Sequence, residues 1–308
     1  MIHPYSRKTY EQRKPRAAGF SPRGRTAALA LSVLLSLTPF SFPASFDTEP
    51  SEATNRSPAP TLTVMTWNIA HGRGTSPNQF GHPEATYKAN IDAVARAIAR
   101  ESPDVVALQE ADAASAWSGS FDHVARIVEA TKYANVHHGL HFEAGVGPLA
   151  ARYGTAILSQ LPLRDTASSK LPDRSFHIKG YVRAEIEFDR RPLLLVSLHM
   201  NSDSKEVRRR QVDHLVEALA PFNKPMIVMG DFNSRWDVED DAVRRVAEKL
   251  RLQAFEPEST RLQTFRSAGP TRRIDWILIS PDLDFVDYAT IADQASDHLA
   301  VRATVRWK

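Results

Sequence analysis

The sequence predicts an α/β fold in which helices flank a mixed β-sheet or two packed β-sheets. Apolar runs typical of strands alternate with amphipathic helical patterns along the 308-residue chain. Strand patterns outnumber helical patterns, and some follow one another directly, which favours mixed pairing over an all-parallel sheet. Several apolar runs end at a polar residue, so we expect polar side chains to gather at strand ends.

Strand and helix patterns alternate in the first half of the predicted folded region. The helix over 86–101 places Ile91, Val94 and Ile98 on one face, and Pro103 ends it. The expected elements are, in order, a strand at 62–68, the helix at 86–101, a buried strand at 105–109, a helix around 124–128 and a strand at 155–159.

The second half contains more strand patterns. Apolar and charged residues alternate over 182–188, which predicts a half-exposed strand, whereas 193–199 is continuously apolar and therefore buried. Asp203 and Glu206 have the spacing of a capping box for a following helix. The remaining expected elements are a strand at 226–230, a helix through 243–250, and strands at 274–279, 285–291 and 299–305.

The N-terminal region differs from the rest of the chain. Residues 1–45 hold seven of the 39 Lys and Arg residues but a single acid, and the stretch 27–42 is apolar and short for a membrane span. This pattern, followed by small residues at 43–45, indicates a signal peptide and hence a secreted or periplasmic protein. The alternative is a membrane anchor through 27–42. Residues 46–60 have the composition of a disordered linker, and the folded domain is expected over 61–308.

Charge and cysteine content narrow the function classes. After residue 45 the chain has 32 basic and 35 acidic side chains, so the folded region offers no general field for a polyanion such as nucleic acid. The chain has no cysteine, which excludes disulfides, a thiolate nucleophile and cysteine-bound zinc.

Two short segments carry the most chemistry, Gly230-Asp231-Phe232-Asn233 and Ser296-Asp297-His298. Phosphoester hydrolysis needs a hard cation to withdraw charge from the phosphoryl group, and magnesium needs only one or two protein carboxylates. Glu110, at the end of a buried strand, is a candidate ligand, and the alternative is a surface acid that caps the next segment. Asn68, His199 and Asp275 close other apolar runs, so the polar residues fit one site built from several strand ends.

The order of residues within these segments suggests particular roles. Asp231 and Asn233 point to the same side of an extended chain, so one could orient a water while the other donates to a phosphate oxygen; a plain turn is the alternative. Asp275 lies in an apolar run, where a carboxylate needs a partner, and His298 or Arg273 could supply it. His199 could protonate the leaving oxygen or polarise the phosphate, or it could be a satisfied core histidine.

Three other motifs carry weaker predictions. The segment 137–141, with three histidines, is interpreted as a loop rather than a metal cluster. Lys205 with 208–210 forms a basic patch that we interpret as a solvated helix face. In the glycine-rich turn after Asn68, Arg73 is a candidate phosphate contact.

Taken together, the motifs resemble the endonuclease/exonuclease/phosphatase superfamily, which includes deoxyribonucleases, abasic-site endonucleases, inositol-phosphate 5-phosphatases and neutral sphingomyelinases. The resemblance covers about residues 61–308. It rests on seven segments in the family's order: Thr66-Trp67-Asn68, Leu108-Gln109-Glu110, Tyr153-Gly154-Thr155-Ala156-Ile157-Leu158-Ser159, Ser197-Leu198-His199, Gly230-Asp231-Phe232-Asn233, Arg273-Ile274-Asp275-Trp276-Ile277-Leu278 and Ser296-Asp297-His298.

The resemblance implies a four-layer sandwich of two packed mixed β-sheets flanked by helices, with the site at one end. Many relatives have Asn where Thr155 stands and Arg-Gly where Lys179-Gly180 stands, so substrate contacts at those positions are open. The implied roles are magnesium binding by Glu110 with Asn68 and Asp297 nearby, water activation by Asp231, phosphate binding by Asn233, orientation of His298 by Asp275, and transition-state stabilisation by His199.

These observations predict an exported, magnesium-dependent phosphodiesterase, with manganese as an alternative ion. The expected substrate is a phospholipid, sphingolipid or small organophosphate. The main alternative is a magnesium-dependent nuclease acting on DNA; a third, a non-catalytic binding module, requires a missing catalytic group, and the main groups are all present. We expect a monomer without an obligate protein partner, in contact with a membrane surface if the substrate is a lipid.

Overall fold

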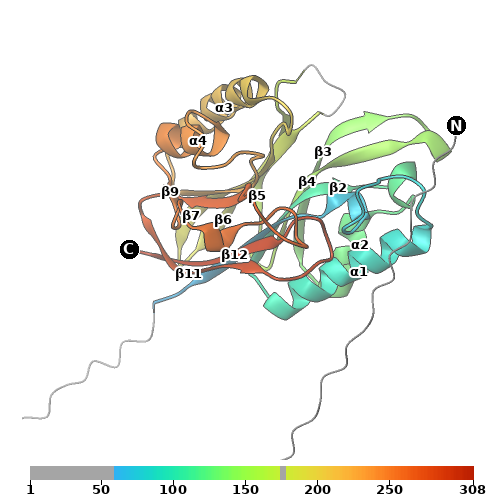
Figure 1. Cartoon of the computed structure of the whole chain (residues 1–308). Helices are drawn as coiled ribbons and strands as arrows, with labels where there is room; N and C mark the ends of the chain where they lie inside the picture. The colour runs from blue at the N-terminus through green and yellow to red at the C-terminus, as the bar shows by residue number, and fades with distance from the viewer. Residues whose placement is uncertain (1–58, 174–177) are drawn as a thin grey trace, which may run out of the picture. The chain divides into compact units, whose positions relative to one another are not determined.

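Two β-sheets packed face to face form the centre of the protein (Figure 1). The computed structural model describes residues 59–173 and 178–308. The predicted signal peptide or anchor, and all but the last two residues of the predicted linker, lie outside the described residues. Within the described ranges, no helix combines the length and apolar character needed to cross a membrane.

The first sheet has the strand order β11-β12-β1-β2-β4-β3. Its central pair, β1 and β2, is parallel, and the other neighbours are antiparallel. The strands are β1 (Leu62–Asn68), β2 (Val105–Asp112), β3 (Asn135–Ala144), β4 (Ala151–Ser159), β11 (Leu283–Ile291) and β12 (Ala300–Trp307).

The second sheet has the order β5-β6-β7-β8-β10-β9 and the same pairing pattern. Here β7 and β8 are the parallel pair, and antiparallel strands extend the sheet on both sides. The strands are β5 (Arg164–Lys170), β6 (Gly180–Phe188), β7 (Arg191–His199), β8 (Met226–Asp231), β9 (Gln253–Ala254) and β10 (Asp275–Ile279).

In the described part of the chain, four α-helices complete a four-layer arrangement (Figure 1). One pair of helices packs on the outer face of the first sheet and the other pair on the outer face of the second. The helices are α1 (Glu84–Glu101), α2 (His123–Thr131), α3 (Lys205–Leu219) and α4 (Ala242–Leu250), and the short 3₁₀ turns are Ala70–Gly72, Ala116–Ser118, Gly147–Leu149, Ala220–Phe222 and Thr260–Leu262.

Alternation along the strands explains the layers. Val64 points into the core between the sheets and Met65 points toward the helices; Leu193 and Leu194 divide in the same way. Strands covered on both faces are apolar at every position, which is why their sequences appear as unbroken apolar runs. The predicted α/β sandwich of two packed mixed sheets flanked by helices is confirmed.

Several local predictions need correction. The histidine-rich segment 137–141 is not a loop but part of β3, the last strand in its sheet. Helix α3 is capped by Ser204, which accepts a hydrogen bond from the Val207 amide, and not by Asp203. Polar edge strands such as β5 lack the apolar alternation on which strand prediction depends.

The basic segment at the start of α3 is only partly a solvated face. Arg208 is buried and forms two 2.8 Å hydrogen bonds with the carboxylate of Asp241, which joins α3 to the N-terminus of α4. Arg209 pairs with Asp240 and Arg210 with Glu206. These arginines therefore already have acidic partners.

Candidate active site

The polar strand ends predicted from the sequence meet at one end of the two sheets. Because β7 and β8 are parallel, their carboxyl ends lie together, and His199 is in register with Asp231. The antiparallel strand β10 begins at the same place, which puts Asp275 in register with Asp231. From the other sheet, Asn68 ends β1 and donates a 3.0 Å hydrogen bond to Oδ2 of Asp231. Sheet topology thus brings four of the predicted residues together.

Glu110 reaches the same region through a β-bulge in β2. The pairing of β2 with β4 shifts register between Gln109 and Ala111, and Glu110 adopts a left-handed conformation with φ 50°. Bulges of this kind redirect a side chain, and they are common beside active sites. Burial would raise the pKa of Glu110, but surrounding cationic groups outweigh it and hold the pKa well below its usual value. The main groups are His71, Lys179 and Arg73.

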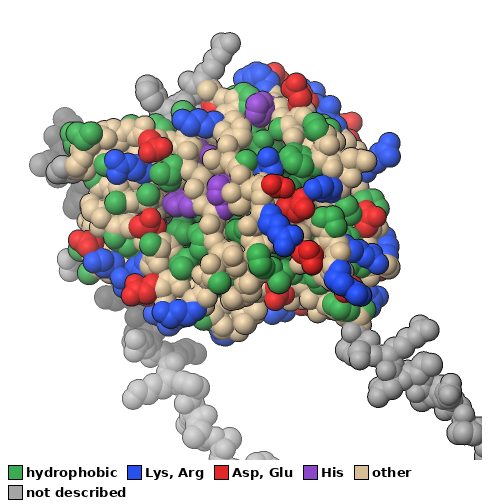
Figure 2. Space-filling model, turned by 180° about the vertical axis from the view of Figure 1, so that it is seen from behind, with side chains coloured by type: hydrophobic (Ala, Val, Ile, Leu, Met, Phe, Trp, Pro, Cys, Tyr) green, Lys and Arg blue, Asp and Glu red, His purple; other side chains and the backbone are tan. Residues whose placement is uncertain are grey.

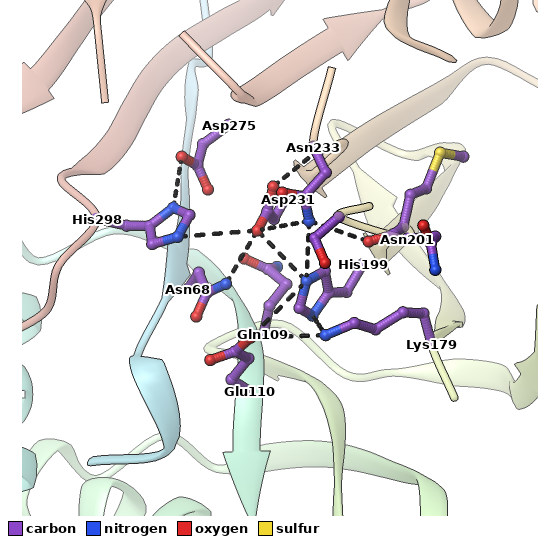
Figure 3. Close-up of polar contacts among 12 residues, drawn as sticks. Asn68, Gln109, Glu110, Lys179, His199, Asn201, Asp231, Asn233, Asp275 and His298 are labelled. Carbon is purple, nitrogen blue, oxygen red and sulfur yellow. Dashed lines mark hydrogen bonds and ion pairs between the residues drawn. The ribbon is translucent and has the colours of Figure 1, made fainter. Parts of the chain in front are cut away.

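The His298 ring lies between two aspartates (Figure 3). Its Nδ1 is 2.9 Å from Oδ2 of Asp275, which also accepts a 2.6 Å hydrogen bond from Thr264. Its Nε2 faces Oδ2 of Asp231 at 3.9 Å, too far for a direct hydrogen bond. Burial would lower the pKa of His298, but Asp275 and then Asp231 raise it to about 10. The imidazole is therefore protonated at neutral pH.

Asp231 is a buried carboxylate that faces both His298 and His199. Its Oδ1 accepts a 2.9 Å hydrogen bond from the backbone amide of Asn233, and its Oδ2 faces Nε2 of His199 at 3.4 Å. Burial, with the neighbouring charge of Asp275, raises the pKa of Asp231 to about 7. A carboxylate whose pKa lies near neutrality is suited to exchange a proton with water.

His199 differs from His298 in its charge. Its Nδ1 lies 3.4 Å from Nζ of Lys179, and burial together with that ammonium lowers the pKa of His199 well below its usual value. Asn233 places Nδ2 3.2 Å from Nε2 of His199 and donates to the Met200 carbonyl. The site therefore contains one neutral and one protonated imidazole. The Lys179 side chain is buried against the site.

The remaining acid, Asp297, is joined to Glu110 by Arg73. The Arg73 Nη2 is 2.8 Å from Oδ2 of Asp297, and its Nη1 is 3.3 Å from Oε2 of Glu110. The guanidinium is held in place by a 3.2 Å hydrogen bond from Nε to the Ser76 carbonyl. The candidate phosphate contact of the glycine-rich turn thus lies between the two predicted metal-binding carboxylates.

All the predicted residues except Asp275 line one pocket of about 260 Å³. Asp275 lies behind His298, whose ring it contacts. The other residues lining the pocket are mainly polar or cationic, and they include Arg73, Lys179, Arg266 and Arg272. The volume is small compared with most ligand pockets, of roughly 300–1,000 Å³. The pocket therefore suits a phosphoryl group with a small substituent, or one end of a larger molecule.

The acids of the pocket fit a hard cation. Oδ1 of Asp297 is buried and has no hydrogen-bond partner among the described residues, and the low pKa of Glu110 keeps that side chain in its carboxylate form. Oxygen ligands of this kind are those that magnesium prefers. Asp231, Asp275 and His298 also have atoms within 4.8 Å of one another that could bind a metal. His298 and Asp275 are already hydrogen-bonded to each other, as Arg73 is to Glu110 and Asp297, and Oδ1 of Asp275 is unpaired like Oδ1 of Asp297 among the described residues, so this group is a second candidate metal site.

A second buried network, which the sequence did not predict, supports the site from behind. Asp112 accepts 2.6 Å hydrogen bonds from His71, Trp117 and Ser118. His71 faces Glu110 with its other nitrogen at 3.4 Å, and burial is outweighed by Asp112 and Glu110, which raise the pKa of His71. The available signal was a second acid, Asp112, two residues after Glu110 in the same apolar run.

Other residues outside the prediction tie the two sheets together beneath the pocket. Gln109 donates to Ser197 at 3.1 Å, across from one sheet to the other. Thr155 is fully buried and contacts His141 at 2.9 Å, so its side chain does not line the pocket. The alternative pairing of Asp275 with Arg273 is not observed: Arg273 donates to backbone carbonyls and stacks on Trp276.

The fold and the pocket define a class of α/β sandwich proteins with the architecture of phosphoesterases and nucleases. The chain belongs to the endonuclease/exonuclease/phosphatase family, whose model matches residues 65–298. This confirms the resemblance predicted from the seven motifs. Members of the family are hydrolases that act on phosphoesters and generally use divalent metal ions.

Solved structures with a similar fold come from several organisms. An endonuclease/exonuclease/phosphatase from Beutenbergia cavernae is 20% identical with a TM-score of 0.62, covering 80% of this chain and 72% of that one. A Bacteroides thetaiotaomicron mannosyl-6-phosphatase is 16% identical with a TM-score of 0.63, covering 80% and 100%. The D. rerio TDP2, in complex with a single-strand DNA product, is 17% identical with a TM-score of 0.59, covering 80% and 99%. A search of curated proteins returned no match.

Proposed function

We propose that this protein is an exported, magnesium-dependent phosphodiesterase that hydrolyses a small organophosphate or the head-group ester of a phospholipid or sphingolipid. One observation carries the proposal: Asp231 faces both a protonated and a neutral imidazole in a pocket that also holds Glu110 and Asp297. Water attack on phosphorus needs a base, cationic groups around the phosphoryl oxygens and carboxylates for a cation, and the pocket contains all three.

Each side chain has a task that follows from its surroundings. Asp231, with a pKa of about 7, takes the proton of the attacking water as the water oxygen bonds to phosphorus and the phosphorus–oxygen bond of the leaving group breaks. His298, protonated and held by Asp275, donates a hydrogen bond to a phosphoryl oxygen. The Asn233 amide and neutral His199 bind the same group from the opposite side.

Glu110 and Asp297, with Asn68 close by, would hold the divalent ion. When bound, such an ion withdraws charge from the phosphoryl oxygens and stabilises the leaving oxygen. Magnesium suits these oxygen ligands, and manganese, which also favours them, is the alternative.

Unpaired positive charge at the pocket supports an anionic substrate. Arg266 and Arg272 line the pocket, both lie over the ring of Phe265, and Phe265 contacts His298 with ring centroids 4.7 Å apart. Among the described residues, neither arginine has an acidic partner within ion-pair distance. Two exposed guanidinium groups beside the catalytic histidine favour binding of a substrate that carries negative charge.

A lipid substrate is supported by apolar side chains on the turn between β3 and β4. Val146 and Leu149 are 79% and 82% exposed, far more than is usual for such residues. They would contact the acyl region of a membrane surface while the pocket receives a head group. Export remains a proposal that rests on the composition of residues 1–45.

DNA hydrolysis is the second candidate. The TDP2 structure contains a DNA product, and that protein shares the fold with this chain. On the face shown in Figure 2, acidic and basic side chains are interspersed without a continuous basic track, which gives no support to DNA binding on that face.

The test is a hydrolysis assay of the full-length protein with magnesium. The substrates are bis-p-nitrophenyl phosphate, p-nitrophenyl phosphate, sphingomyelin vesicles and supercoiled plasmid. We expect release of nitrophenol from the diester or of head group from vesicles, loss of activity with EDTA and recovery with added magnesium. Nicking of plasmid without turnover of the other substrates would establish the DNA alternative, and turnover of none of the four would refute the proposed activity.

A further inference from the structure

The guanidinium of Arg73 occupies an unusual place, because it separates the two acids best suited to hold a metal. Its terminal nitrogens bridge Glu110 and Asp297 at 3.3 and 2.8 Å, and the bridge is only 18% exposed at the arginine side chain. A second metal ion between Oε2 of Glu110 and Oδ2 of Asp297 would lie next to the fixed positive charge of Arg73. In phosphoesterases with two metal ions, the ions clamp the attacking and leaving oxygens from both sides.

We propose that Arg73 is the second cation of this site: it takes the place of a second metal ion, limits the pocket to one divalent ion and binds the phosphoryl group. The inference rests on the proposed function, since it assigns a part of the same site.

The donor inventory of Arg73 supports contact with substrate. A guanidinium has five N–H groups. One is used by the Ser76 carbonyl, one by Glu110 and one by Asp297, which leaves two on the terminal nitrogens. Arg73 lines the pocket together with Asp231 and His298, so the free donors and the proposed base border the same space. A planar fork of donors matches the oxygens of a phosphate.

The carboxylates retain capacity for a single ion. Arg73 contacts Oδ2 of Asp297, whereas Oδ1 is buried without a hydrogen-bond partner among the described residues. On Glu110, Arg73 contacts Oε2, whereas Oε1 faces Lys179 at 3.6 Å. Each acid therefore has one oxygen on Arg73 and one directed elsewhere, and Asn68 lies close to the same region. Oδ1 of Asp297 is thus the unpaired oxygen that is left to bind one ion beside the arginine.

Simple structural bridging is the competing explanation, and it makes a different prediction. A bridge that only supports the loop would change stability when removed, but it would change neither the number of bound ions nor the affinity for phosphate. A cation that replaces a metal ion repels an incoming divalent ion, and its removal strengthens metal binding while weakening phosphate binding.

The first experiment measures metal binding directly. Manganese is titrated into full-length wild-type protein, Arg73→Gln and Arg306→Gln, and free Mn²⁺ is followed by electron paramagnetic resonance. Arg306 is an exposed arginine of β12 outside the pocket and serves as the matched control. We expect one Mn²⁺ per chain in the wild type and in Arg306→Gln. In Arg73→Gln we expect a second Mn²⁺ or about tenfold tighter binding of the first, as loss of one nearby positive charge predicts.

The second experiment measures phosphoryl binding without turnover, with methylphosphonate as the probe and saturating magnesium, by calorimetry. We expect about tenfold weaker binding in Arg73→Gln, the size of one lost charge-assisted hydrogen bond, and no change in Arg306→Gln. Arg73→Lys keeps the charge and loses the fork, so it should retain one Mn²⁺ and bind methylphosphonate with intermediate affinity. If Arg73→Gln does not fold, Arg73→Lys carries the test.

Two ions per wild-type chain bound at Glu110 and Asp297, shown by their loss in Glu110→Gln, would overturn the proposal. Unchanged metal and methylphosphonate affinities in Arg73→Gln would do the same. Both measurements are independent of catalysis. A protein that binds metal as expected but hydrolyses none of the four substrates would thus refute the proposed function and leave the role of Arg73 standing.

Discussion

Oδ2 of Asp231 lies 3.9 Å from Nε2 of His298, and the protein displaces the pKa of both partners upward, to about 7 and about 10. Asp275 contributes to both shifts, since its charge disfavours ionisation of Asp231 and favours protonation of His298. At neutral pH the histidine keeps its proton and the aspartate can give up its own. His298 is therefore a cationic group and Asp231 is a base, and both face the same pocket.

The first prediction concerns this pair. Asp231→Asn and His298→Gln should each lower kcat by about 100- to 10,000-fold, the range expected for loss of positioned acid–base catalysis. The measurement is steady-state turnover of bis-p-nitrophenyl phosphate, with circular dichroism to show that each variant is folded. Turnover equal to that of the wild type in either variant would contradict the assigned roles.

The second prediction concerns pH and stability without metal. A raised pKa means that the folded state binds the proton more tightly than the unfolded state. The contribution of His298 is therefore complete below pH of about 6.5 and is lost as the pH rises through about 10. Urea unfolding in EDTA should show a free energy of unfolding that falls between pH 7 and pH 10. In Asp275→Asn this fall should be much smaller, and an identical fall would show that Asp275 does not hold the proton on His298.

The third prediction concerns the arginines on the pocket wall. Arg266→Gln and Arg272→Gln should raise KM for an anionic substrate by about tenfold each, with a smaller effect on kcat, because each removes one charged contact to the bound substrate. Raising the salt concentration should weaken substrate binding in the wild type more than in the double variant. Arg306→Gln is the control. A KM that does not change in the double variant would exclude substrate binding by these arginines.

The fourth prediction concerns the glycine before Asp231. Gly230 has φ 146°, and a Cβ there would lie 2.0 Å from the Leu198 carbonyl oxygen of the neighbouring strand. Gly230→Ala should therefore destabilise the protein by at least about 1–3 kcal/mol and lower kcat, since β7 and β8 carry His199 and Asp231.

The matched control is Gly269→Ala, where an added Cβ meets no atom within 4 Å. Both variants are compared by urea unfolding and by turnover. Equal stability of Gly230→Ala and the wild type would show that the strands can separate there without cost.

The elements that the sequence predicted are those whose pattern has a local cause. β7 and β8 appear as unbroken apolar runs because both of their faces are buried, and α1 appears through its 3.6-residue spacing. β3 was missed because it lies at the end of its sheet, and its polar residues and glycine do not alternate as a strand with one buried face would.

For the site, the sequence indicated which residues to examine, because polar groups that close apolar runs are rare and informative. Glu110, His199, Asp231 and Asp297 were all found in this way, and the structure brings them to one pocket. The sequence could not show that Arg73 joins Glu110 to Asp297, because those contacts link residues that are 37 and 224 positions apart.

The sequence by itself determined the layers and the chemical groups that are present. Burial on two faces and periodic apolar spacing both depend on the local order of residues. Only the tertiary structure decided the charge of each group: His199 is neutral beside Lys179 and His298 is protonated beside Asp275. The two imidazoles have the same intrinsic chemistry. Their pKa values differ because the field at each ring comes from side chains that are distant in sequence and adjacent in space.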